Sequence, residues 1–138
     1  MQTFPREWIV VDGNSSDATI NVLHSFGENV QWISKEDRGI YDAMNYGISM
    51  STGDYVVFMN AGDKFYDSET LARVADALSE ARPVADILFG GAMLSFLDGE
   101  RSIYRPPRLV KNSLWHGLPA NHQATYYRKT LLDKTPII

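Results

Sequence analysis

Residues 36–48 read EDRGIYDAMNYGI, and residues 53–63 read GDYVVFMNAGD. In the first stretch a charged loop precedes apolar residues at helical spacing, which predicts a helix that begins near Ile40. In the second stretch Tyr55 to Met59 is the most apolar strand pattern of the chain, and we expect it at the centre of a sheet. This strand ends on an acidic turn. A loop, a helix, a strand and an acidic turn in this order are typical of phosphate and metal sites in α/β proteins.

The alternation of strands and helices extends to both sides of this stretch. Glu7 to Asp12 is a short apolar run, rich in β-branched residues, which predicts a buried parallel strand. A helix that stops near Gly27 follows, and Val30 to Ser34 predicts the next strand. Farther along, Asp67 or Ser68 can cap another amphipathic helix. This order predicts a parallel sheet with helices on both faces.

The C-terminal third has a different pattern. After Pro83, residues 85–91 and 92–97 have strand character, and Asp98-Gly99 predicts a β-hairpin with a two-residue turn. We therefore expect a single α/β domain over residues 1–138. Its predicted architecture is a Rossmann-like three-layer sandwich with a mostly parallel central sheet and a C-terminal hairpin.

Composition limits the classes of protein to which the chain can belong. Its 138 residues include no cysteine, so disulfides and thiolate metal ligands are excluded, which fits a reducing compartment. The formal net charge of −4 is modest and gives no indication of nucleic-acid binding. No apolar run approaches the roughly 20 residues of a membrane-spanning helix, and no signal-peptide pattern is present. We expect a cytoplasmic protein, with peripheral contact at the inner face of the membrane left open.

A small basic run lies near the C-terminal third, at Arg101, Arg105, Arg108 and Lys111. Two interpretations stay open for it. The side chains form either a solvated edge beside the Pro106-Pro107 turn or a clamp for phosphate or for an acidic acceptor.

Polar segments follow the predicted parallel strands, where ligands of open α/β sheets bind. They are Asp12 to Asp17, Ser34 to Asp42, and Asn60 to Asp63. Asp12 ends its strand, so its carboxylate can accept hydrogen bonds from a base or a ribose, or can instead cap its own loop. Asp17 is better explained as a helix cap, because an acidic residue opposes an anion at a helix N-terminus.

The loop before the helix at Ile40 carries the next candidates. Arg38 stands at the predicted N-terminus, where a positive charge gains nothing from the helix dipole. Its position is explained either by a bound anion or by pairing with a neighbouring acidic residue. Asp42 and Asn45 are three residues apart on one helix face, which belongs either to a binding site or to a solvated surface.

Asp63 is the best candidate for a metal ligand. Mg²⁺ and Mn²⁺ prefer oxygen ligands, and sites that handle phosphates often use only one or two protein carboxylates. Asn60 can add its amide oxygen. The four residues Asn-Ala-Gly-Asp are also compatible with an ordinary turn after a strand.

Two histidines, His116 and His122, lie in the segment WHGLPANHQ at residues 115–123. Histidine can act as a base near neutral pH, and it can equally be a packed residue. No Gly-x-Gly-x-x-Gly, Walker-type or Gly-x-Ser-x-Gly motif occurs, so dinucleotide oxidoreductases, P-loop enzymes and α/β-hydrolases have no support. No histidine cluster suggests zinc.

Taken together, the motifs resemble the family 2 glycosyltransferases, inverting enzymes of GT-A fold, and especially bacterial members that build capsule, exopolysaccharide of the colanic-acid type, or O-antigen. The matching segments are WIVVDGNSSDAT at residues 8–19, SKEDRGIYDAMNYGI at residues 34–48, GDYVVFMNAGD at residues 53–63, and the later His122-Gln123. They follow the order of the family and cover nearly the whole chain.

The resemblance implies a nucleotide-sugar donor, often UDP-linked, with Mg²⁺ or Mn²⁺ on its diphosphate, and a glycan or lipid-linked acceptor. The metal neutralises the departing diphosphate while a base deprotonates the attacking hydroxyl. The implied positions are Asp12, Arg38, Asp42 and Asn60 for nucleotide-sugar binding, Asp63 for the metal, His116 and Gln123 on the acceptor side, and His122 as candidate catalytic base.

The resemblance also implies a core fragment of such an enzyme. The family normally opens with another strand and helix before Gln2, and its usual catalytic Asp lies beyond Ile138. We expect exposed strand edges to be covered by self-association, which gives a homo-oligomer. Two functions remain: a glycosyltransferase domain of surface polysaccharide biosynthesis, or a truncated, non-catalytic nucleotide-sugar-binding or assembly module of the same fold.

Overall fold

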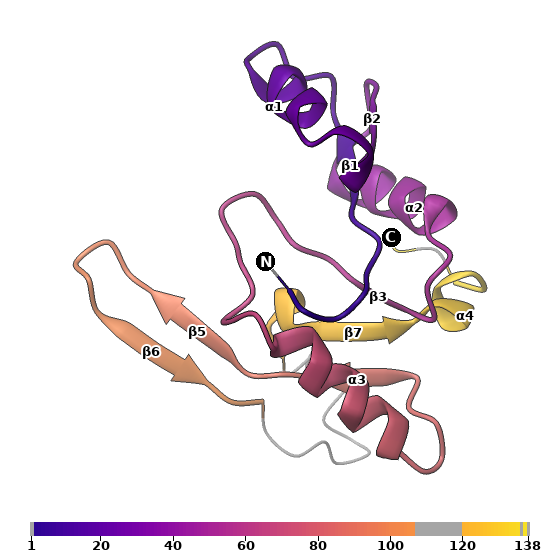
Figure 1. Ribbon diagram of the computed structural model, residues 1–138, viewed down its shortest axis with the longest axis vertical. Coiled ribbons are helices and arrows are strands. Elements are labelled where there is room, and N and C mark those ends of the chain that lie inside the picture. Colours follow the sequence, from indigo (N-terminus) through magenta and orange to yellow (C-terminus); the bar gives the residue numbers. More distant parts are fainter. Residues whose placement is uncertain (1, 107–119, 136, 138) are drawn as a thin grey trace. The chain divides into compact units, whose positions relative to one another are not determined.

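The computed structural model describes residues 2–106, 120–135 and 137. Strands and helices alternate as far as α3 and are then followed mainly by strands, which confirms the predicted α/β class (Figure 1). The chain divides into two compact units, each made from segments that are distant in the sequence. The first unit comprises Met1–Phe4 and Val57–Arg128, and the second comprises Pro5–Val56 and Lys129–Ile138.

The second unit is built on a pair of parallel strands, as the apolar runs predict. In this pair Asp12 lies opposite Ser34, so both strands end at the same level. The elements of this unit are β1 (Ile9–Asp12), α1 (Thr19–Ser25), η1 (Gly27–Asn29), β2 (Gln31–Ser34), α2 (Ile40–Met50) and α4 (Lys129–Leu132). The predicted end of the first helix near Gly27 is confirmed, and this glycine has a positive φ of 56°.

Helix α2 packs on β1 through its apolar side. Met44 and Ile48 of α2 are buried, together with Leu23 of α1. Gly47 faces Val11, and a Cβ at Gly47 would lie 3.7 Å from the Val11 Cγ2 atom, an ordinary packing distance. The helical spacing from Met44 to Ile48 therefore reflects the face that α2 buries, whereas Ile40 at the start of the predicted face is exposed.

The first unit has a sheet in the order β3-β7-β4, in which β4 and β7 are antiparallel. Of β3 (Tyr55–Val57), only the last residue, Val57, belongs to this unit. The other elements are α3 (Thr70–Glu80), β4 (Ile87–Phe89), β5 (Ala92–Ser95), β6 (Arg101–Tyr104), η3 (His122–Ala124) and β7 (Thr125–Arg128). Among the described strands β7 is the middle one, so the expected central place of Tyr55 to Met59 is wrong. An apolar run shows that both faces of a strand are covered, but it does not show which edges are paired.

Pairing in the described sheets is mixed: β1 and β2 are parallel, whereas β4 with β7 and β5 with β6 are antiparallel.

The C-terminal hairpin is confirmed, but the prediction of a two-residue turn is wrong. Phe96 N donates to Glu100 O at 2.9 Å, which leaves a three-residue loop. Gly99, with φ at 86°, is the last residue of this loop, as expected for a type I turn followed by a left-handed residue.

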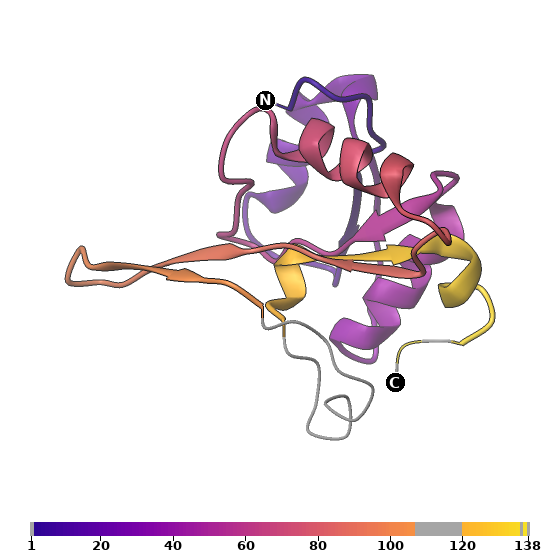
Figure 2. The same ribbon diagram turned by 90° about the horizontal axis from the view of Figure 1, so that it is seen from below.

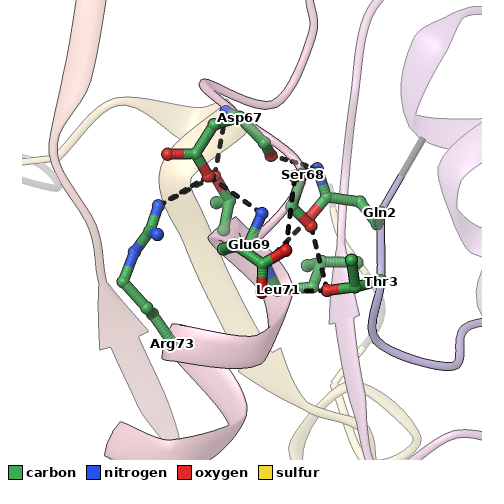
Figure 3. A network of polar contacts seen from close by, with 8 residues as sticks. Gln2, Thr3, Asp67, Ser68, Glu69, Leu71 and Arg73 are labelled. Carbon is green, nitrogen blue, oxygen red and sulfur yellow. Dashed lines mark hydrogen bonds and ion pairs between the residues drawn. The ribbon is translucent and has the colours of Figure 1, made fainter.

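Helix α3 lies over one face of β4 and β7 (Figures 1 and 2). Its N-terminus is capped by side chains from two segments (Figure 3). Asp67 Oδ1 accepts a hydrogen bond from Glu69 N at 3.0 Å and pairs with Arg73 at 2.7 Å. Gln2 Oε1 accepts from Leu71 N at 2.9 Å. The N-cap residue of α3 is Glu69, whose own side chain makes no capping hydrogen bond, so the predicted cap at Asp67 or Ser68 lies one or two residues too early. Asp67 and Gln2 instead bind the backbone N–H groups of Glu69 and Leu71.

None of the helices in the described ranges is long and apolar enough to cross a membrane.

Candidate functional site

Asp12, at the carboxyl end of β1, is held by its own loop and by the neighbouring strand. It is 7% exposed. Its Oδ2 accepts hydrogen bonds from Ser15 N at 2.9 Å and from Ser34 Oγ at 2.6 Å, and its Oδ1 accepts from Ser15 Oγ. Ser34 can reach Asp12 because the two residues are opposite each other in the parallel register. Of the two interpretations left open for Asp12, the structure therefore shows the capping of its loop.

These hydrogen bonds stabilise the charged form of the Asp12 carboxylate. The side-chain hydrogen bond from Ser15 and then the one from Ser34 lower the pKa of Asp12 below its ordinary value, against an opposing effect of burial. Asp12 thus carries a negative charge whose lone pairs are largely used by protein donors.

The loop before α2 packs against the loop after β1. A Cβ at Gly13 would lie 2.9 Å from Asp37 Oδ2, so the Asp37 carboxylate rests directly on the Gly13 backbone. The other oxygen of Asp37 accepts from Gly39 N at 2.9 Å, next to the start of α2. Asp37 therefore connects the two loops that carry Asp12 and Arg38.

Arg38 and Asp42 lie at this same helix start. Asp42 Oδ2 accepts from the backbone N of Arg38 at 3.3 Å, so its carboxylate reaches back from the first turn of α2 to the loop residue before the N-cap, Gly39. The Arg38 side chain is exposed and has no ion pair among the described residues. Asn45 does not join them: its side chain donates to Ile137 O at 2.8 Å and accepts from Ile137 N at 3.0 Å.

Asp63 belongs to the first unit, in the turn that follows β3. The turn is closed by a hydrogen bond from Asp63 N to Asn60 O at 3.1 Å, and Gly62 has a positive φ of 93°. Both Asn60 and Asp63 are exposed. Asp63 Oδ2 accepts one hydrogen bond, from Gln123 Nε2 at 2.8 Å, and Oδ1 has no partner within the described ranges.

His122 and Gln123 are brought to this turn by η3. The ring of His122 stacks on Phe58, with the centroids 5.6 Å apart and the planes at 8°. Its Nε2 is shielded from solvent and has no hydrogen-bond partner among the residues that the structure describes. His116, Arg108 and Lys111 lie outside the described residues, and Arg101 and Arg105 are exposed.

The described part of the chain holds no group of three or more His, Asp or Glu side chains suited to a metal ion. Asp63 is thus a single exposed carboxylate, beside an amide residue at Asn60. Such a donor set fits a hard cation only where a phosphate ligand and water complete the coordination.

The sequence interpretation missed Ser34 and Phe58, which shape these sites. It considered Asp37, like Glu36, only as an ion-pair partner of Arg38, and no such pair occurs among the described residues. A signal existed for Ser34, because it ends the strand next to Asp12 and neighbouring parallel strands end together. No local signal existed for Phe58, whose partner His122 lies 64 positions later in the chain.

Comparison with known proteins gives the family. The family model of Glycosyl transferase family 2 matches residues 2–134. The chain is 37% identical over 133 residues to a PGL/p-HBAD biosynthesis glycosyltransferase of Mycobacterium tuberculosis, covering 91% of this chain and 48% of that protein. It is 33% identical over 130 residues to an uncharacterized glycosyltransferase of the same species, covering 93% and 49%. The chain spans about half the length of these relatives.

A solved structure shows the same fold. The crystal structure of Staphylococcus aureus TarS 1-349 in complex with UDP superposes with a TM-score of 0.70 at 20% identity, covering 96% of this chain and 41% of that one. The expected α/β architecture of GT-A type is thereby confirmed. The chain belongs to glycosyl transferase family 2.

Proposed function

We propose that the chain is a nucleotide-sugar-binding domain that transfers a sugar from a UDP-linked donor to a glycan or lipid-linked acceptor. The observation that carries the proposal is the exposed Asp63 carboxylate, with one oxygen unpaired among the described residues, in a chain that the family matches over residues 2–134. Because that match runs through both compact units, we propose that they belong to one domain.

For the nucleoside we propose Asp12, Arg38 and Asp42, with Asn60 beside the sugar diphosphate. Arg38 can approach an anionic ligand, because its exposed side chain has no ion pair within the described residues. Asp12 and Asp42 contribute mainly by fixing the loops, since each carboxylate already holds backbone or serine donors.

For the cation, Mg²⁺ or Mn²⁺, we propose Asp63 as the protein carboxylate. A hard cation on a diphosphate needs few protein ligands because phosphate oxygens and water supply the rest. When bound, the cation supplies charge neutralisation for the departing nucleoside diphosphate. Asp63 contributes a carboxylate oxygen, and Gln123 holds the side chain in a fixed direction.

His122 remains the candidate base proposed from the sequence, but its geometry supports an anchoring role better. Phe58 covers one face of the ring, and Nε2 is shielded from solvent. A general base must approach the proton that it removes to about 3 Å. Replacement of a true base lowers kcat by about 100-fold or more, so His122→Phe tests the role directly.

The acceptor class is proposed from the relatives. One of them is named for PGL/p-HBAD biosynthesis, so a lipid-linked or glycolipid acceptor is the first to examine, with surface polysaccharide as the second. We propose a cytoplasmic place for the protein, with peripheral contact at the inner face of the membrane where a lipid-linked acceptor is used. Cell fractionation tests this location.

We also propose self-association. The β5–β6 hairpin carries large apolar side chains that are exposed within its unit: Leu94, Phe96, Leu97 and Ile103. A two-stranded hairpin with exposed apolar residues is stabilised when another surface covers it. Size-exclusion chromatography with light scattering tests the proposal, and a stable monomer contradicts it.

Calorimetry with UDP in Mn²⁺ and in EDTA tests the donor site. We expect Mn²⁺-dependent binding of UDP, weaker binding of ADP, and loss of affinity in Arg38→Gln. Hydrolysis of a UDP-sugar then distinguishes an enzyme from the alternative function, a non-catalytic binding or assembly module. If no nucleoside diphosphate binds under any condition, the donor-site proposal is wrong.

A further inference from the structure

We infer that Gln123 is a positioning residue for the carboxylate of Asp63, and that His122 anchors the turn from which Gln123 acts. The inference rests on the proposed function, because it concerns the carboxylate proposed there for the cation. It gives Gln123 a role on the donor side of the reaction, whereas the family resemblance predicts the acceptor side.

The contact itself joins two residues that are 60 positions apart. Gln123 Nε2 donates to Asp63 Oδ2 at 2.8 Å, and Asp63 Oδ1 has no partner among the described residues. An amide donor fixes the direction of the carboxylate and leaves its charge intact. A lysine or arginine at the same place would compete with the cation for that charge. Neutral hydrogen-bond donors behind a metal ligand usually have this orienting role.

Three hydrogen bonds hold the backbone around Gln123. Asn121 Oδ1 accepts from Gln123 N at 3.0 Å. Thr125 is fully buried, and its Oγ1 donates to Asn121 O at 2.9 Å. Gly90 N donates to Ala124 O at 2.6 Å, which ties η3 to the end of β4. The amide of Gln123 therefore starts from a fixed backbone, so its hydrogen bond costs little ordering entropy.

The turn that carries Asp63 is held by its own backbone. Asp63 N donates to Asn60 O, and Gly62 takes the positive φ that the turn requires. At the start of the same segment, Phe58 stacks on His122 at 5.6 Å. Two neighbouring contacts, Phe58 with His122 and Asp63 with Gln123, thus join the same two segments of the first unit.

The stack of His122 on Phe58 gives His122 a structural role next to Gln123. Its ring packs η3 against the segment after β3, and its Nε2 is shielded from solvent. If the stack is lost, the turn loosens and the amide of Gln123 no longer has a fixed direction. His122→Phe keeps a flat ring in this position and preserves the stack.

The test measures Mn²⁺ affinity of the UDP-loaded protein by the EPR signal of free Mn²⁺. We expect Gln123→Leu to weaken Mn²⁺ binding roughly tenfold, as for other residues behind a metal ligand, with the thermal midpoint and the affinity for UDP in EDTA unchanged. Gln31→Leu is the matched control, because Gln31 is an exposed glutamine on β2, in the second unit. His122→Phe should retain wild-type Mn²⁺ affinity.

Gln123→Glu gives an independent readout. Two carboxylates within hydrogen-bond distance raise the pKa of one of them, so a proton competes with the cation. Mn²⁺ affinity of this variant should rise more steeply with pH from about 5 to 8 than that of the wild type. A side chain at position 123 that does not contact Asp63 would leave the two profiles parallel.

The outcomes distinguish a failure of the inference about Gln123 from a failure of the proposed function. If Asp63→Asn loses Mn²⁺ affinity while Gln123→Leu retains it, the inference about Gln123 is wrong and the donor site stands. A pH profile in Gln123→Glu that is no steeper than that of the wild type also overturns the inference, and it decides the matter if Gln123→Leu fails to fold. If the wild type shows no Mn²⁺-dependent UDP binding, the proposed function is wrong, and the inferred role of Gln123 is then wrong as well.

Discussion

Asp12 in the second unit ends a strand and Asp63 in the first unit lies in the turn after a strand, yet their surroundings are opposite. Asp12 is 7% exposed and accepts three hydrogen bonds from Ser15 and Ser34. Asp63 is exposed and, among the described residues, accepts one, from the neutral amide of Gln123. The position of a carboxylate in the topology indicates where ligands bind, but its unused lone pairs decide whether it can hold a cation.

The largest expected effect comes from removing the Asp12 carboxylate. Asp12→Ala leaves the Ser15 and Ser34 donors unsatisfied in a part-buried loop, so we expect the free energy of unfolding to fall by about 2 to 3 kcal/mol. Asp63→Ala should change it by less than about 0.5 kcal/mol, since the residue is exposed. Urea denaturation of both variants measures the difference. Equal destabilisation would remove the contrast between the two residues.

Two glycine-to-alanine variants test the contact between Gly13 and Asp37 that holds the loop after Asp12. Gly13→Ala places a Cβ 2.9 Å from Asp37 Oδ2, so the carboxylate must move, and we expect a loss of about 1 to 2 kcal/mol. Gly47→Ala is the matched control, because its Cβ meets Val11 at 3.7 Å inside α2. This control should gain about 0.5 to 1 kcal/mol from helix propensity. A neutral Gly13→Ala would mean that Asp37 does not constrain the loop.

A smaller effect is expected from Ser34→Ala, with a defined dependence on pH. The pKa of Asp12 is lowered in the folded state, so its hydrogen bonds stabilise the fold above the ordinary Asp pKa and are lost as pH falls through the folded value. We expect Ser34→Ala to cost about 1 kcal/mol at pH 7 and progressively less below about pH 4. Denaturation at a series of pH values checks this. A cost that persists unchanged at pH 2 would contradict the assignment.

The sequence predicts well what depends on local pattern. The apolar runs and the capping residues place β1, β2, α2 and α3 within a few residues, and Asp98-Gly99 predicts the hairpin. The two-residue turn fails because Gly99 adopts its positive φ as the third loop residue, a choice that the dipeptide alone does not determine.

The candidate sites are only partly predictable. Asp12 and Ser34 are polar residues at the ends of two predicted strands, and their contact follows from the parallel register. The approach of Gln123 to Asp63 depends on η3 and β7 coming back beside the segment after β3, a nonlocal arrangement without a signature in either segment. The roles of Asp12, Arg38, Asp42, Asn60, Asp63, His116, His122 and Gln123 in sugar transfer remain predictions.

The central claim is that Asp63 is the carboxylate available to a cation. Calorimetric titration of Mn²⁺ and UDP into the wild type and into Asp63→Asn tests it most directly, because asparagine keeps an acceptor for Gln123 and removes only the charge. We expect Asp63→Asn to fold with a wild-type thermal midpoint and to lose at least roughly tenfold in Mn²⁺-dependent affinity for UDP. Unchanged Mn²⁺-dependent affinity in Asp63→Asn would contradict the claim.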